Sequence, residues 1–369
     1  MTGRILVVNA GSSSLKLRVL GPDDAVDGAA DLPAPRGVTD ARDLETAIRG
    51  LGDVDAVGHR IVHGGTVFSG PVRIDPGVVR RLVALTDLAP LHQPKSLAAL
   101  AAVTAVIPAV PSVACFDTAF HASLSPAAYT YALPPEWRKR WDLRRYGFHG
   151  LSHAYASRRA AELLGRTPQG LRIVTCHLGA GASLAAVRDG RSVDTTMGFT
   201  PLEGLVMATR SGSVDPGLVL WLAEHVGMPP AELAATLENR SGLLGLAGTA
   251  DMREILEGAG EGEPAMQLAL DVYVHRLRGS IASMAAAMGG IDVLVFTGGV
   301  GEGAPAVRAR AADGLGFLGV VLDPVANGLP GSDDRDIGAP GAPVRAFVVA
   351  AREDVEIARG VREALAGSS

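Results

Sequence analysis

Cysteine, long apolar runs and clusters of basic residues are all scarce in this chain, and each scarcity excludes a class of protein. Only Cys115 and Cys176 occur in 369 residues. Both lie beside apolar runs, which indicates reduced core thiols and not a disulfide framework. No apolar stretch reaches the roughly 18 residues of a transmembrane helix, and the early run Ile5–Val8 is too short for a signal peptide. We therefore expect a cytoplasmic protein with no membrane partner.

Basic residues do not form a cluster that could bind a polyanion. The formal net charge is −5, and the only lysines are Lys16, Lys95 and Lys139. We interpret the locally basic stretch 138–145 as a solvated face, so nucleic acid is not expected as a partner. A chain of 369 residues with 47% hydrophobic content is long enough to form two domains with separate cores.

The most informative stretch that is present is ILVVNAGSSSLKLRVL, residues 5–20. An apolar run, six small or polar residues and an alternating run predict two strands joined by a tight loop. Gly11 permits close backbone approach, and the N–H groups and hydroxyls of Ser12–Ser14 can converge on an anion, with Lys16 just beyond. The loop suits a polyphosphate, although an ordinary polar hairpin turn would read the same way.

The same pattern returns later in the chain. Residues 171–177 form an apolar run, LGAGAS follows as a glycine-rich turn, and 184–188 reads as the next strand. Asp189-Gly190 is a hairpin signal before a third strand at 191–196, matching a third strand expected at 25–30 in the first copy. The repeat predicts two related domains that each contribute a loop to one cleft. The alternative is coincidence between two hairpins.

A third glycine-rich stretch, 297–303, follows the apolar run 291–296, and Pro305 stands where a helix can begin. Strand, glycine loop and helix start favour a phosphate site. The three glycine-rich loops at 9–14, 179–183 and 297–303 lack a Walker-type lysine pattern. Together they argue for a nucleotide held between two domains.

Periodicity and turn residues predict further elements. We expect a loop over 31–42 and a helix capped by Ser152 that runs to about Gly165. The other expected helices are 44–51, 76–85, 94–106, 266–288 and 353–365. The other expected strands are 56–62, 112–116 and 344–350.

Two arginines and one carboxylate are candidates for chemistry. Arg60 ends an apolar strand, and Arg210 lies in the small-residue stretch MATRSGSVDPG. The planar guanidinium group binds phosphate or carboxylate in a bidentate way. Asp117 directly follows a buried strand, where α/β folds place active carboxylates.

Two histidines four residues apart, His149 and His153, have the spacing of a helical zinc site. The intervening residues lack the glutamate of that motif and no third ligand is near in sequence, so zinc is disfavoured. A structural role is the competing interpretation for His153 and for His121.

Ten motifs that include these residues resemble the acetokinase family of acetate kinases, within the actin, Hsp70 and sugar kinase superfamily. They occur in the order of the family and span nearly the whole chain. They are NAGSSSLK (9–16), GHRIVHGG (58–65), APLHQP (89–94), FDTAFH (116–121), RRYGFHG (144–150), CHLGAGAS (176–183), DTTMGFTPLEGL (194–205), TRSGSVDPG (209–217), SGLLG (241–245) and FTGGVGE (296–302).

The resemblance implies an α/β fold of two ribonuclease-H-like domains with a nucleotide cleft between them. The expected domains are 1–121, with the closing helix 355–367 packed back on it, and 122–354 with the nucleotide site. The family also implies a homodimer and reversible transfer of the γ-phosphoryl group of ATP to acetate, which gives acetyl phosphate and ADP. The implied metal is Mg²⁺, with Mn²⁺ as an alternative.

Residue roles are implied in the same way. The implied catalytic residues are Asp117, His149 and Arg210, and the implied metal ligands are Asn9 and Glu353. Acetate would lie against Arg60, Val62, Leu91, Phe148 and Pro201. The nucleotide would contact Ser12, Ser14, Lys16, His177, Leu178, Gly179, Ala180, Gly181, Asp251, Met252, Arg253, Gly299, Val300, Gly301, Glu302 and Gly303.

This inventory suits a carboxylate acceptor. Acetate, with a pKa of roughly 4 to 5, is ionised at neutral pH and needs no general base. The obstacle is repulsion between anions, which two arginines, a histidine and Mg²⁺ address. We therefore interpret Asp117 as an organiser of metal or arginine. The resemblance also implies that Val62, Leu91, Phe148 and Pro201 form a small apolar acetate pocket, which should accept propionate poorly and butyrate worse.

Three positions depart from the family pattern. Ala180 and Gly303 replace asparagine, and Met252 replaces an aromatic residue, so we expect weaker or less selective nucleotide binding. Three alternatives to an acetate kinase stay open. The first is a propionate or butyrate kinase of the same fold, and the second is a non-catalytic nucleotide switch of the actin or Hsp70 type. The third is a sugar kinase, which would need a base and a polar pocket.

Overall fold

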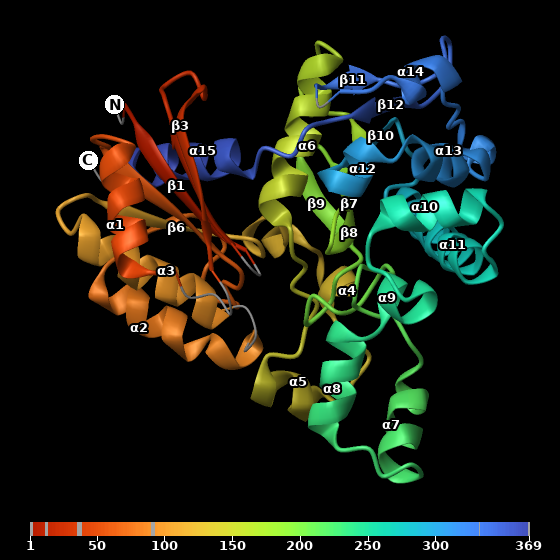
Figure 1. Ribbon diagram of the computed structural model, residues 1–369, viewed down its shortest axis with the longest axis horizontal. Helices are drawn as coiled ribbons and strands as arrows, with labels where there is room; N and C mark the ends of the chain where they lie inside the picture. The colour runs from red at the N-terminus through yellow and green to blue at the C-terminus, as the bar shows by residue number, and fades with distance from the viewer. Residues whose placement is uncertain (1–2, 12–13, 35–38, 90–92, 332, 368–369) are drawn as a thin grey trace. The chain divides into compact units, whose positions relative to one another are not determined.

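The structure is a computed structural model that describes residues 3–11, 14–34, 39–89, 93–331 and 333–367. The chain divides into two compact units (Figure 1). Unit 1 consists of Met1–Ala122, Phe148–Tyr155 and Arg352–Ser369, and unit 2 consists of Ser123–Gly147 and Ala156–Ala351. The helix α6 (Gly150–Leu163) begins in unit 1 and continues into unit 2.

Unit 1 is built on a six-stranded sheet in the order β3-β2-β1-β4-β6-β5. Its strands are β1 (Ile5–Ala10), β2 (Ser14–Leu20), β3 (Val26–Pro33), β4 (Ala56–Ile61), β5 (Val72–Arg73) and β6 (Ser112–Phe116). The helices are α1 (Ala41–Gly50), α2 (Pro76–Ala84), α3 (Gln93–Val106) and α15 (Glu353–Ala366), with 3-10 turns η2 (Thr86–Leu88) and η3 (Ala119–Ser123). β1, β4 and β6 run parallel, so their carboxyl ends lie at one edge of the sheet.

Side chains that alternate along β4 pack against different helices. Val57 packs with residues of α1 and α3, including Leu44 and Val103. A Cβ on Gly58 would lie 2.5 Å from the Cγ2 of Ile357, so α15 covers the opposite face of the sheet at close range. Because strand residues point alternately to the two faces, Arg60 shares the α15 face with Gly58.

Unit 2 repeats the topology of unit 1 with the strand order β11-β12-β10-β7-β8-β9. Its strands are β7 (Arg172–Leu178), β8 (Ala182–Arg188), β9 (Arg191–Thr195), β10 (Val293–Thr297), β11 (Arg335–Asp336) and β12 (Arg345–Val348). Read in reverse, β9-β8-β7-β10-β12-β11 matches β3-β2-β1-β4-β6-β5, and the corresponding pairs have the same parallel or antiparallel sense. The predicted internal repeat is confirmed.

Unit 2 also contains most of the helices. They are α4 (Pro126–Tyr129), α5 (Pro135–Trp141), α7 (Pro216–Glu224), α8 (Pro230–Asn239), α9 (Gly242–Ala247), α10 (Met252–Gly260), α11 (Pro264–Ala287), α12 (Gly298–Gly303), α13 (Pro305–Asp313) and α14 (Pro324–Gly328), with the 3-10 turn η4 (Gly316–Leu318). The predicted core helix is α11, which buries Tyr273, Leu277 and Ile281. The predicted hairpin turn at Asp189-Gly190 is confirmed, with φ of 55° and 75°.

The stretch 297–303 is a helix and not the predicted loop. Thr297 ends β10 and occupies the N-cap position of α12 without a side-chain hydrogen bond, and the helix starts at Gly298 with φ of 78°. A Cβ on Gly298 would lie 2.8 Å from the carbonyl oxygen of Leu178, so only glycine fits there. The Glu302 carboxylate accepts hydrogen bonds from the N–H groups of Gly298 (2.9 Å) and Ala351 (3.0 Å). These contacts offset the low helix propensity of glycine.

Two smaller predictions were also wrong. Ser152 lies inside α6, which starts at Gly150 directly after the left-handed residue His149, so Ser152 does not cap it. The segment 31–42 is not all loop, because β3 extends to Pro33 through pairing with β2 and α1 begins at Ala41. The Asp40 carboxylate caps α1 by accepting hydrogen bonds from the Arg42 and Asp43 N–H groups.

Cys115 and Cys176 are free and buried, and burial raises the pKa of both thiols. Their predicted place in the core is confirmed. Among the helices of the described residues, none is both long enough and apolar enough to cross a membrane.

Candidate active site

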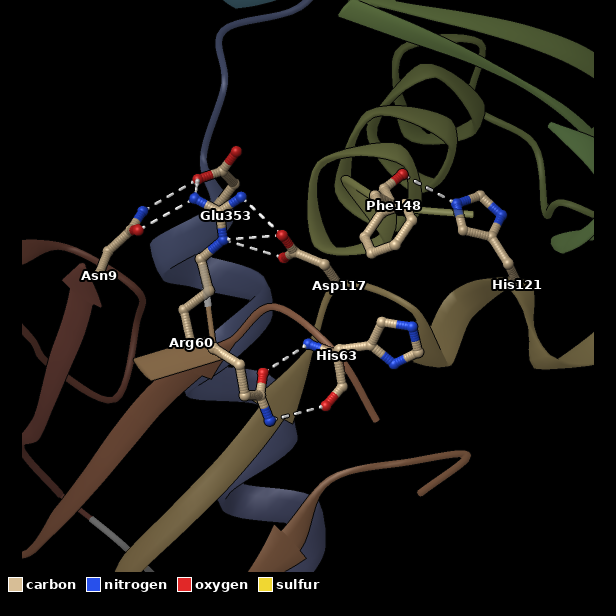
Figure 2. A network of polar contacts seen from close by, with 8 residues as sticks. Asn9, Arg60, His63, Asp117, His121, Phe148 and Glu353 are labelled. Atoms are coloured by element: carbon tan, nitrogen blue, oxygen red, sulfur yellow. Dashed lines mark hydrogen bonds and ion pairs between the residues drawn. The ribbon is translucent and has the colours of Figure 1, made fainter. Parts of the chain in front are cut away.

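The carboxyl ends of three parallel strands in unit 1 bring together Asn9, Arg60 and Asp117 (Figure 2). Arg60 Nε donates to Asp117 Oδ1 at 2.9 Å and Oδ2 at 3.1 Å, and Arg60 Nη2 donates to Asp117 Oδ2 at 2.7 Å. Asp117 is held in turn through its N–H group, which donates to the Ile61 carbonyl at 3.0 Å. The two side chains form a bidentate ion pair between neighbouring strands.

The first residue of α15 completes this cluster. Asn9 Oδ1 accepts from Arg60 Nη1 at 3.0 Å, and Asn9 Nδ2 donates to Glu353 Oε2 at 3.0 Å. Glu353 Oε2 also lies 3.6 Å from Arg60 Nη1. In Figure 2 the Arg60 guanidinium lies between Asn9 and Glu353 on one side and Asp117 on the other. The predicted metal residues therefore adjoin the predicted acceptor arginine.

Burial and pairing set the charges of the cluster. Desolvation opposes the charge of Arg60, but attraction to Asp117 and Glu353, with the hydrogen bonds to Asp117, raises its pKa above the usual value. Asp117 is only 2% exposed, and this burial raises its pKa while the Arg60 guanidinium opposes the rise. We assign the pair as ionised because three hydrogen bonds from the guanidinium reach the carboxylate.

His149 is fixed beside Asp117 by an unusual backbone conformation. Its φ of 57° is left-handed, which costs a non-glycine residue energy and is often found at functional sites. The next residue, Gly150, donates its N–H to the Asp117 carbonyl at 2.8 Å, and a Cβ there would lie 2.3 Å from that oxygen. The backbone of Asp117 thus holds the start of α6, and His149 with it.

Phe148, a predicted acceptor residue, is buried among histidines. Its ring meets that of His63 edge-on, with centroids 5.5 Å apart, and its carbonyl lies 3.1 Å from His121 Nε2. His121 and His153 are both buried, and their rings meet edge-on with centroids 5.7 Å apart, in line with a structural role for both. Val62, the other described apolar candidate in unit 1, directly precedes His63 and is half-buried.

Sequence reasoning missed His63 and Gln93, which shape the same region. The His63 N–H donates to Gln93 Oε1 at 3.2 Å, and Gln93 Nε2 donates back to the His63 carbonyl at 3.2 Å. The Gly65 N–H donates to His63 Nδ1 at 2.9 Å, so the proton of the neutral ring is on Nε2. Both residues stood in motifs already noted, GHRIVHGG and APLHQP. Leu91, in the second motif, lies outside the described residues.

The predicted phosphate loop is only partly described. Asn9 belongs to β1, Ser14 opens β2, and the Gly11 N–H donates to the Ser14 carbonyl at 2.8 Å. Lys16 is exposed and lies opposite Asn9 in the β1–β2 register, so its backbone is next to one member of the cluster of Asn9, Arg60, Asp117 and Glu353. Ser12 lies outside the described residues.

Arg210 and Pro201 lie in unit 2 and contact each other. Arg210 Nη1 donates to the Pro201 carbonyl at 3.2 Å. Burial lowers the pKa of Arg210, and the nearby Glu238 opposes that fall. The two residues are nine positions apart, and the loop between them brings the predicted arginine and pocket residue together.

The predicted nucleotide residues of β7 and α12 adjoin each other in unit 2. β7 and β10 are parallel, with His177 opposite Thr297, so the 179–181 turn and α12 both start from the same edge of the sheet. Leu178 is buried, whereas Ala180 is exposed. The remaining predicted residues of α12 are Gly299, Val300, Gly301, Glu302 and Gly303. The Glu302 carboxylate is already used by the Gly298 and Ala351 N–H groups.

Asp251, Met252 and Arg253 form the start of α10. Asp251 is the N-cap residue of α10. Its carboxylate accepts hydrogen bonds from the side chain and from the backbone N–H of Arg253, and these bonds lower the pKa of Asp251 to about 2. Met252 is buried at 5% exposure and faces the core. The Arg253 side chain is strongly exposed.

The donor atoms of the unit 1 cluster suit a hard cation. A carboxylate on Glu353 and an amide oxygen on Asn9 are the oxygen ligands that Mg²⁺ prefers, and Mg²⁺ commonly keeps several waters and substrate phosphates as its other ligands. Within the described ranges, no three His, Cys, Asp or Glu side chains form a metal-ligand group. The oxygens of Glu353 and Asn9 therefore fit a two-ligand magnesium site.

A family model matches most of the chain. The model of the Acetokinase family covers residues 38–359. The chain belongs to the acetokinase family. Its curated relatives include the acetate kinase of Geobacillus kaustophilus (strain HTA426), with 41% identity over 97% of this chain and 98% of that protein. The acetate kinase of Bacillus subtilis (strain 168) has 40% identity over 97% and 98%.

Solved structures agree with this acetokinase assignment. The crystal structure of Porphyromonas gingivalis acetate kinase has a TM-score of 0.90 and 36% identity, covering 98% of this chain and all of that one. A propionate kinase from Francisella tularensis has a TM-score of 0.89 and 33% identity, covering 98% and 99%. The predicted family and the α/β fold of two ribonuclease-H-like domains are confirmed.

Proposed function

We propose that this acetokinase is an acetate kinase that reversibly transfers the γ-phosphoryl group of ATP to acetate, giving acetyl phosphate and ADP. The observation that carries the proposal is the cluster of Asn9, Arg60, Asp117 and Glu353 at one sheet edge. It combines a half-buried, permanently charged arginine with oxygen ligands for a cation. The names of the relatives, which match over nearly the whole chain, support the same reaction.

The reaction needs positioning and charge stabilisation more than proton transfer. Acetate is already ionised, so no base has to activate it. Asp117 gives its carboxylate to Arg60 in a bidentate pair, which leaves it poorly placed to accept a proton. Its proposed role is to fix the guanidinium that binds the acetate or the transferring phosphoryl group.

Arg210 and His149 are the proposed partners of Arg60. The guanidinium of Arg210 would stabilise the charge of the transferring phosphoryl group. His149, held in its left-handed conformation, would donate a hydrogen bond to the same group. Before substrate binds, the Arg210 guanidinium contacts the Pro201 carbonyl, and the backbone next to His149 is held by the bond from the Gly150 N–H to the Asp117 carbonyl.

Magnesium is part of the proposal, with Glu353 and Asn9 as the residues that would hold it. When bound, the ion would neutralise negative charge on the phosphates. The nucleotide would bind at the β7 and α12 edge of unit 2 and at the start of α10. We also propose a homodimer, as the family resemblance implies, and light scattering of the purified protein tests it.

Acetate is the proposed acceptor because the pocket candidates Val62, Phe148 and Pro201 are apolar. A misfit methylene costs on the order of 1–3 kcal/mol, so propionate should react less well and butyrate least. The similarity to a propionate kinase makes propionate the second candidate acceptor.

The deciding experiment traps the acyl phosphate with hydroxylamine. The protein is incubated with ATP and Mg²⁺ and with acetate, propionate, butyrate or no acid. We expect hydroxamate with acetate well above the other acids. A maximum with propionate or butyrate would keep the reaction class and overturn the acceptor. No hydroxamate with any acid, from folded protein that binds ATP, would favour a nucleotide switch, and glucose phosphorylation would favour a sugar kinase.

A further inference from the structure

Pro201, a predicted acetate residue, and Arg210, a predicted catalytic residue, belong to one irregular segment of unit 2, residues 196–213, which we call the acceptor loop. Besides the contact of Arg210 with the Pro201 carbonyl, the Met207 N–H donates to the Arg210 carbonyl at 3.2 Å. Gly204 and Ser213 also close the loop through two hydrogen bonds. The Ser213 N–H donates to the Gly204 carbonyl at 3.0 Å, and the Gly204 N–H donates to Ser213 Oγ at 3.0 Å. The Arg210 guanidinium therefore has the Pro201 carbonyl as one partner. The backbone on either side of Arg210 is held separately, because the Ser211 N–H donates to the Leu237 carbonyl and the Ser241 N–H donates to the Thr209 carbonyl, both at 2.9 Å.

The first half of the acceptor loop is held by one carboxylate. Glu203 Oε2 accepts a hydrogen bond of 2.5 Å from the Tyr131 hydroxyl, and Glu203 Oε1 accepts one of 2.7 Å from Arg145 Nη2. The Tyr131 oxygen accepts the Phe199 N–H at 2.9 Å. Tyr131 and Arg145 lie far from the loop in sequence, so they attach it to another part of unit 2.

Arg145 makes a second set of contacts with the same loop. Its Nη1 donates to the carbonyls of Thr196 (3.1 Å) and Met197 (2.9 Å). One guanidinium therefore joins the first residues of the loop to Glu203. The residues on either side of Pro201 are thereby held to common partners, Arg145 and Tyr131.

Gly198 is required by this arrangement. A Cβ on Gly198 would lie 1.8 Å from Glu203 Oε2 and 2.2 Å from the Tyr131 hydroxyl, so no other residue fits. Its carbonyl accepts the N–H groups of Tyr146 (3.0 Å) and Gly147 (3.3 Å). The loop approaches Glu203 closely because the side chain is absent.

The direction of the Tyr131 hydrogen bonds is also defined. Burial and the bond to Glu203 raise the pKa of Tyr131, so its hydroxyl keeps the proton at physiological pH. It can then donate to Glu203 and accept from Phe199 at the same time. A phenylalanine would keep the ring and lose both contacts.

We propose that Tyr131, Arg145 and Glu203 are positioning residues for the acceptor site, since they fix the first half of the acceptor loop and with it the Pro201 carbonyl that the Arg210 guanidinium contacts. They touch no reacting atom in this scheme. The inference rests on the proposed function for its kinetic consequences, but not for its structural ones.

Tyr131→Phe and Glu203→Gln test the proposal, with Tyr146→Phe as the matched control. The Tyr146 hydroxyl donates to the Asp142 carbonyl at 2.9 Å, outside the loop. Losing a hydrogen bond to a charged group should raise the KM for acetate about tenfold. The KM for ATP should stay within about twofold of wild type, and the ratio of kcat/KM for acetate over propionate should fall. Tyr146→Phe should match wild type in all three.

Amide hydrogen exchange provides a readout that needs no activity. Peptides covering 196–213 should exchange faster in both test variants, while peptides of α10 should not change. Variants with a lower Tm but unchanged kinetics and unchanged loop exchange would overturn the proposal, as would equal rises in both KM values. If one variant does not fold, the other decides on the same readouts. If wild type phosphorylates no acid, the proposed function fails, and loop exchange alone decides whether the network positions the loop.

Discussion

Arg60 and Asp117 are joined by three hydrogen bonds across the neighbouring strands β4 and β6, and the carboxylate is almost fully buried. The pair gives the guanidinium one orientation, with Nη1 directed to Asn9 and Glu353. A carboxylate engaged in this way organises an arginine. The three contacts with Arg60 favour the organisation of arginine over that of the metal, and the next experiment separates the two.

Asp117→Asn tests this role. An amide cannot balance the half-buried guanidinium of Arg60, so we expect kcat/KM for acetate to fall at least about 100-fold, the range seen when a preorganised charge-stabilising group is lost. The Mg²⁺ concentration that gives half-maximal activity should not change. Steady-state kinetics over a Mg²⁺ titration measures both quantities.

Asp292→Asn is the matched control, because Asp292 forms a bidentate pair with Arg172 at the opposite end of β10 from Thr297. It should lose stability and keep activity. A large shift of the Mg²⁺ requirement in Asp117→Asn, or an activity loss of equal size in Asp292→Asn, would contradict the assignment.

Glu353→Gln should weaken the metal site. The carboxylate supplies the only formal negative charge of the two proposed magnesium ligands, so we expect about a tenfold rise in the Mg²⁺ concentration for half-maximal activity. Glu363→Gln, an exposed change on the same helix, is the control. The same Mg²⁺ dependence in Glu353→Gln and wild type would remove Glu353 from the metal site.

Stability should fall as the pH drops from about 6.5 toward about 4, because of buried neutral histidines. Burial lowers the pKa of His59 from 6.5 to about 4. Neither ring nitrogen of His59 has a hydrogen-bond partner in the described part of the chain. Between these two values the unfolded chain binds a proton that the folded chain does not, so His59 destabilises the fold by up to about 3 kcal/mol at pH 4 and not at all above pH 6.5. His63 shifts in the same direction.

His59→Leu should therefore lose less Tm than wild type between pH 7.5 and pH 5, as measured by calorimetry. Carboxylates also titrate toward the lower pH, but they are common to both proteins and cancel in the difference. His275→Gln, at an exposed position on α11, should follow wild type. Parallel Tm curves for His59→Leu and wild type would show that His59 does not carry this dependence.

The sequence predicted most elements because apolar periodicity and turn residues act locally. The repeat was visible because each half places the same small-residue turn between the same strands. The Arg60–Asp117 pair was not predicted, because it depends on β4 lying beside β6, and local sequence patterns do not determine the order of strands in a sheet. The sequence indicated only that Arg60 and Asp117 each lie at the end of an apolar run.

The error at 297–303 has a similar origin. Glycine content predicts a loop, but α12 is stabilised by the Glu302 carboxylate and by the N–H of Ala351, which is 49 positions away. The contact between Tyr131 and Glu203 spans 72 positions. Such contacts are set by tertiary packing, and only a resemblance to a known family could have suggested them.

Ala180→Asn and Gly303→Asn should tighten nucleotide binding. Apart from its chain neighbours and the backbone of its own helix, no described atom lies within 4 Å of where a Cβ on Gly303 would stand, and Ala180 is exposed, so both positions accept a larger side chain. One added hydrogen bond of ordinary strength lowers a dissociation constant by about fivefold. We expect each variant to lower the KM for ATP by about that factor and to leave the KM for acetate unchanged.

Gly260→Asn, at an equally open glycine that ends α10, controls for the effect of a polar surface residue. Competition between ATP, GTP and inorganic polyphosphate then shows whether selectivity rises with affinity. If wild type already binds ATP tightly and selectively, the lost asparagine side chains are not needed, and the backbone groups of the 179–181 turn and α12 must supply the recognition. If the variants also change the KM for acetate, the two positions act on the acceptor side, and their assignment to the nucleotide would be wrong.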